Sequence, residues 1–70
     1  MIGILIFPDF QLLDATGPAS VFEIAQRLVP TAATSRMIAV EPGAVRSSSG
    51  VEVLAAGLRS AEAVTTLVVA

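Results

Sequence analysis

The acid best placed to do chemistry in this chain is Asp14, which stands in the largely apolar stretch 10–18. Charged side chains are seldom buried without a partner. The stretch directly follows residues 2–7, an apolar run typical of a buried strand. A carboxylate just past the carboxyl end of a buried parallel strand lies where open α/β sheets bind ligands. Asp14 could there orient a substrate, move a proton or hydrogen-bond to a nucleophile. The alternative is an ordinary turn or helix-start residue that satisfies backbone N–H groups.

Two further segments contain residues that could take part in binding or catalysis. Gly17, between Thr16 and Pro18, could expose backbone N–H groups at a helix N-terminus to an anion, although ordinary helix initiation predicts the same residues. The serines at 47–49 would need a base to act as nucleophiles, and the chain has no His, so a turn is predicted there. Neither a Gly-x-Gly-x-x-Gly sequence nor a phosphate-loop Lys is present, so nucleotide binding is not supported.

Composition excludes several classes of function. The chain has no Cys and no His, which rules out a disulfide framework and the usual zinc sites, and we expect neither a metal nor a cofactor. Its net charge is −2, with four basic residues, all Arg, and six acids, so direct nucleic-acid binding is not indicated. The apolar N-terminus lacks basic residues and the roughly 20 apolar residues of a membrane span. We therefore expect no membrane association, a cytoplasmic location and, from the Lys-free composition, a bacterial origin.

The elements that would position Asp14 follow an α/β pattern. We predict strands at 2–7, 36–40 and 66–70, the last one buried, and a helical turn at 11–15. Gly17 and Pro18 are predicted to start a helix that ends at Pro30, with Glu23 and Arg27 paired on its polar side. Strands at 45–47 and 51–54 are predicted to form a hairpin outside the main sheet, and 58–64 a short helix or loop. Strand, helix and strand in this order indicate a parallel sheet.

Together these segments resemble the start of the ThiJ/PfpI domain, which has the class I glutamine amidotransferase-like fold. The resemblance rests on residues 4–14, on Gly17 and Pro18, on Val21 and Phe22, and on segments 42–51 and 67–69. It implies an α/β fold of the flavodoxin-like type, a sandwich built on a parallel sheet. Residues 1–70 would then be an incomplete, N-terminal portion of one such domain.

Two branches of this family share the opening segment, and they imply different functions. In AraC-type transcriptional regulators the domain senses a small molecule, and a later helix-turn-helix domain, absent from this chain, contacts DNA. Residues 10–14 and 22–28 look most like that branch. In isonitrile hydratase-like enzymes, an Asp that matches Asp14 is catalytic beside a cysteine nucleophile. No residue here can take the role of that cysteine, so the chain alone is not expected to be an enzyme. The resemblance implies ligand binding by Asp14 and Gly17, and a homodimer in the intact protein.

Overall fold

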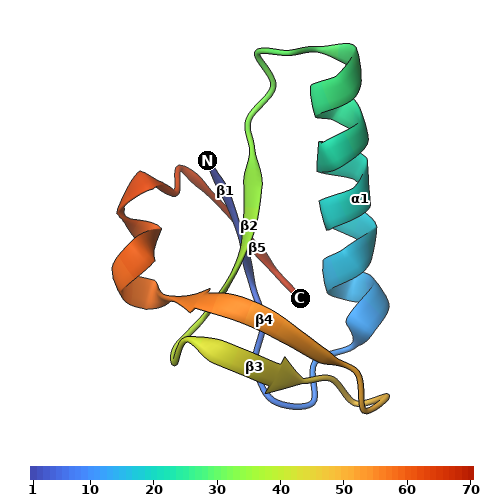
Figure 1. The fold of residues 1–70 in the computed structure, drawn as a ribbon, viewed down its shortest axis with the longest axis vertical. Coiled ribbons are helices and arrows are strands. Elements are labelled where there is room, and N and C mark those ends of the chain that lie inside the picture. The colour runs from blue at the N-terminus through green and yellow to red at the C-terminus, as the bar shows by residue number, and fades with distance from the viewer.

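The computed structural model describes the backbone of residues 1–70 and every side chain except that of residue 60. The elements are β1 (Ile2–Leu5), α1 (Leu12–Leu28), β2 (Ser35–Ala39), β3 (Gly43–Arg46), β4 (Glu52–Gly57), the 3₁₀ helix η1 (Leu58–Ala63) and β5 (Thr66–Val69). The strands form one five-stranded sheet in the order β3-β4-β2-β1-β5 (Figure 1). Only the β3–β4 pair is antiparallel. The predicted α/β class with a mostly parallel sheet is therefore confirmed.

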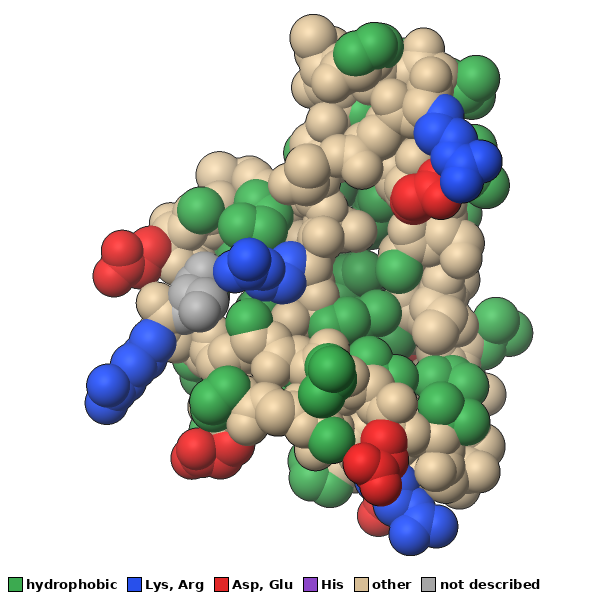
Figure 2. Space-filling model, viewed as in Figure 1, with side chains coloured by type: hydrophobic (Ala, Val, Ile, Leu, Met, Phe, Trp, Pro, Cys, Tyr) green, Lys and Arg blue, Asp and Glu red, His purple; other side chains and the backbone are tan. Residues whose placement is uncertain are grey.

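The core lies between α1 and one face of the sheet. Ile4 and Ile6 of the first strand segment are fully buried, as the apolar run 2–7 predicted. The alternation of side chains along a strand places both on the same face, where they pack against the helix. The buried core cluster consists of Ile4, Ile6, Phe10, Ala15, Ala39, Val45 and Ala55. Figure 2 shows most of the charged side chains near the outline of the molecule, with apolar side chains between α1 and the sheet.

The predicted helix start at Gly17 and Pro18 is wrong, because α1 begins five residues earlier at Leu12. The Gln11 side chain caps the helix by accepting a hydrogen bond from the Asp14 backbone N–H at 3.1 Å. Pro18 therefore lies inside the helix, where it offers no N–H to the Asp14 carbonyl four residues earlier. The predicted Glu23–Arg27 pair is confirmed, with 2.7 Å between Oε1 and Nη2.

The predicted hairpin does not lie outside the main sheet but forms part of it. β4 pairs in parallel with β2, placing Ala56 beside Ile38 and Gly57 beside Ala39. The predicted strand at 51–54 is too short, and the residues after it, two Ala and one Gly, have low strand propensity. Pairing with β2 overrides that local preference and extends β4 to Gly57.

β5 is a strand as predicted, but it is not buried. It pairs with β1, while Leu67 and Val69 remain 53% and 62% exposed. These two side chains project from the face opposite α1, since their neighbours Ala70 and Val68 pack on the core cluster. Within the described residues, no helix is long and apolar enough to cross a membrane.

Candidate ligand-binding site

The carboxyl ends of β1 and β2 meet at one edge of the sheet, because the two strands run in parallel. The chain moves from β1 outward to β2 and β4, then returns to the other side of β1 as β5 (Figure 1). The strand order thus reverses at β1. In open α/β sheets, the crevice outside the carboxyl ends at such a reversal is the usual place for a ligand.

The loop after β1 has a fixed conformation. Asp9 adopts a left-handed backbone conformation, with φ of 66°, and its N–H donates to the Arg46 carbonyl at 2.8 Å. The Ser48 N–H donates to the Phe10 carbonyl at 2.9 Å. The side chain of Phe10 is 1% exposed and belongs to the core cluster. The loop is therefore held by the end of β3 and by the turn that follows it.

That turn is itself fastened by a buried hydroxyl. Ser47 is only 1% exposed, and its Oγ accepts a hydrogen bond from the Val51 N–H at 3.1 Å. The same Oγ lies 2.9 Å from the Ser49 hydroxyl, with which it shares a hydrogen bond. Gly50 supplies the positive φ of 89° that the turn needs. The serine segment thus forms the turn that the sequence predicted.

Asp14 and Gly17, the two residues singled out by the sequence, lie in the first turns of α1. Three residues apart, they share one side of the helix. Asp14 is exposed, and Gly17 is half-buried with no atom within 4 Å of the position that a Cβ would take. Neither residue lines the two cavities found at the carboxyl edge.

The first of these cavities lies at the ends of β1 and β2 and has a volume of about 440 Å³. Its wall is mostly apolar, with one acid and one base. The lining residues are Ile6, Phe7, Pro8, Ala39, Val40, Glu41, Pro42, Ala44, Val45 and Arg46. A site of this size with few polar groups suits a small, largely apolar molecule.

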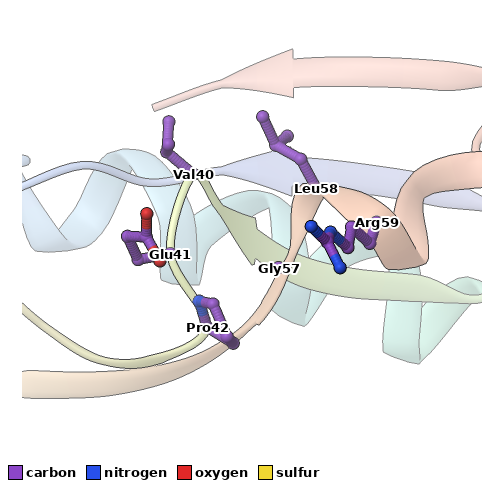
Figure 3. Close-up of a pocket in the computed structure, with 6 residues that line it drawn as sticks. All are labelled: Val40, Glu41, Pro42, Gly57, Leu58 and Arg59. Carbon is purple, nitrogen blue, oxygen red and sulfur yellow. The ribbon is translucent and has the colours of Figure 1, made fainter.

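The second cavity, of about 520 Å³, lies between the ends of β2 and β4 (Figure 3). Its lining residues are Val40, Glu41, Pro42, Gly57, Leu58 and Arg59. Sequence reasoning missed Glu41 and Arg59. Glu41 carries the same signal as Asp14, an acid after a parallel strand, whereas Arg59 reaches the edge only because β4 joins the sheet. Among the described residues there is no group of three or more His, Cys, Asp or Glu that could hold a metal ion.

The chain is a mixed α/β fold with two cavities at the carboxyl edge of its sheet. Comparisons with family models, curated proteins and solved structures gave no match for this chain.

Proposed function

We propose that residues 1–70 are the N-terminal part of a ThiJ/PfpI-type domain that senses a small molecule in an AraC-type transcriptional regulator. The complete domain would have the flavodoxin-like architecture. DNA contact would belong to a helix-turn-helix outside these residues, and the intact protein would be a homodimer. The main support is the largely apolar cavity beside the end of β1, at the point where the strand order reverses.

Binding accounts for these residues better than catalysis does. The chain contains no Cys and no His, so the residues present supply neither the thiol nor the imidazole of common nucleophilic sites. The two charged residues of the first cavity, Glu41 and Arg46, are both exposed at its wall. One acceptor group and one donor group beside a largely apolar wall can hold a small apolar ligand that has a hydroxyl group.

Asp14 and Gly17 line neither cavity, and this proposal keeps them as additional ligand contacts on α1, outside the first cavity. Glycine costs a helix about 1 kcal/mol relative to alanine, and proline about 3 kcal/mol. No neighbouring atom requires a glycine at position 17, yet Gly17 and Pro18 stand together inside the helix. Departures from local rules are expected where function demands them. Two groups of Asp14 are offered to the ligand. One is its carboxylate, and the other is its backbone carbonyl, which receives no hydrogen bond from Pro18.

The proposal is tested by titrating the ¹⁵N-labelled chain with benzyl alcohol, a small apolar probe with one hydroxyl. We expect shifts of the amide signals of residues 6–7 and 44–46, and a several-fold loss of affinity in Arg46→Ala. Arg36→Ala is the matched control, because Arg36 is exposed on β2 and lines neither cavity. Equal affinity in the two variants, or no shift in either segment, would contradict the proposed site.

The contribution of Asp14 needs a separate variant. Asp14→Asn keeps the size of the side chain and removes its charge, while the backbone N–H that bonds to Gln11 stays in place. If Asp14 binds the regulator's natural ligand, Asp14→Asn in the intact protein changes the ligand concentration needed for the DNA response. An unchanged response would exclude the Asp14 carboxylate as a ligand contact.

A further inference from the structure

The second cavity is lined by residues from two distant parts of the chain, 40–42 and 57–59. Pro42, from the loop after β2, packs on Gly57 at the end of β4, where an added Cβ would lie 3.2 Å from the proline Cδ. A side chain at position 57 would therefore displace Pro42. This close approach brings the loop that carries Glu41 next to the segment that carries Leu58 and Arg59.

Opposite charges line this cavity without neutralising each other. Glu41 and Arg59 both belong to its wall, and both are exposed. Among the described side chains the ion pair is Glu23–Arg27 on α1, and Glu41 and Arg59 form none. Figure 3 shows the Arg59 guanidinium turned toward Gly57, with Glu41 on the far side of the loop segment. A ligand with one anionic and one cationic group could satisfy both side chains.

An apolar surface accompanies the two charges. Val40 is 69% exposed and Leu58 47%, and their side chains point to the same side of the cavity in Figure 3. Two of the six lining residues are charged, against two of ten in the first cavity, so the second cavity is suited to a more polar ligand. An ammonium group, a carboxylate and an aliphatic side chain would together match Glu41, Arg59 and this apolar pair.

We infer that the second cavity is a binding site for a free aliphatic α-amino acid. Arg59 binds the carboxylate through its planar guanidinium, Glu41 binds the ammonium group, and Val40 and Leu58 contact the side chain. This site is separate from that of the proposed sensor function, although the loop 40–42 borders both cavities.

The test is a titration of the ¹⁵N-labelled chain with L-leucine. We expect shifts of the amide signals of residues 40–41 and 57–59, and Arg59→Ala should weaken binding about tenfold. Arg36→Ala removes an exposed Arg outside the cavity and should bind leucine as the parent chain does. Equal losses in the two variants, or no shift with about 10 mM leucine, would overturn the inference.

Two analogues separate recognition of both charges from simple hydrophobic contact. 4-Methylpentanoate lacks the ammonium group, and 3-methylbutylamine lacks the carboxylate. We expect each to bind about tenfold more weakly than leucine. Equal affinities for all three compounds would show that only apolar contacts hold the ligand. They would overturn the inference that Glu41 and Arg59 bind its charged groups.

These experiments test the two proposed sites separately. Arg46 lines only the first cavity, so Arg46→Ala should leave the affinity for leucine unchanged. Arg59 lines only the second, so Arg59→Ala should leave the affinity for benzyl alcohol unchanged. Loss of leucine binding in Arg46→Ala would show that leucine occupies the first cavity and would refute the second site.

Discussion

At the residue scale, Gly3 and Gly17 are under opposite constraints. A Cβ at Gly3 would lie 3.0 Å from Ile38 Cδ1 and 3.1 Å from both Val64 Cγ atoms, whereas at Gly17 it would meet no atom within 4 Å. We expect Gly3→Ala to lower the free energy of unfolding by about 1–3 kcal/mol through overpacking. Gly17→Ala should raise it by up to about 1 kcal/mol, because alanine is the better helix former. Urea unfolding followed by circular dichroism measures both, and changes of the same sign would contradict this account.

The buried hydroxyl of Ser47 also stabilises the structure through a single side chain. Ser47→Ala removes the acceptor of the Val51 N–H in a buried position, so we expect a loss of about 1–2 kcal/mol in unfolding free energy. Ser49→Ala is the control, since Ser49 is exposed and its hydroxyl shares a hydrogen bond with the Ser47 hydroxyl alone. It should cost at most about 0.5 kcal/mol. Comparable losses for the two variants would mean that Ser47 does not fasten the turn.

At the element scale, the loop after β1 and the β3–β4 hairpin should open together. The amides of Asp9 and Ser48 belong to a loop and a turn, yet each donates to a backbone carbonyl of the other segment. We expect slow hydrogen exchange at both amides, and faster exchange at both in Ser47→Ala, because hydrogen-bonded units open cooperatively. The Ser49 amide, which has no hydrogen-bond acceptor among the described residues, should exchange quickly in either chain. Independent exchange of Asp9 and Ser48 would show that the two segments are not coupled.

At the scale of the whole molecule, the sheet is covered unequally on its two faces. α1 covers one face, while Leu67 and Val69 stay exposed on the other, beside the free edge of β5. An uncharged edge strand next to exposed apolar side chains favours association between sheets. We therefore expect the mean mass in sedimentation equilibrium to rise with protein concentration. The double variant Leu67→Thr and Val69→Thr should reduce this rise.

A matched control distinguishes this face from exposed apolar residues in general. Leu13 and Leu28 are 69% and 78% exposed on α1, away from the free edge. Replacing both with Thr should leave the concentration dependence as it is in the parent chain. A greater effect of the helix variants than of the β5 variants would place the association on α1 instead.

The sequence by itself determined the features that depend on neighbouring residues. The run 2–7 contains β1, and residues 66–70 contain β5, because apolar β-branched runs favour strands wherever they stand. The Glu23–Arg27 pair follows from helical spacing alone. The serine turn follows from the Ser-Gly composition of residues 47–50. The α/β class follows from the order of these elements, since strand, helix and strand close most simply as a parallel sheet.

Only the tertiary structure decided how the distant segments meet. Gln11 could not be identified as the cap of α1 from the sequence, where Gly17 and Pro18 are the stronger local start signals. Whether β4 joined the sheet depended on its register with β2, a contact between residues far apart in the chain. That pairing brings Arg59 to the same edge as Glu41 and creates the second cavity. The exposure of β5 also depended on tertiary structure. An apolar run shows that a strand favours burial, but whether it is buried depends on which other elements cover it.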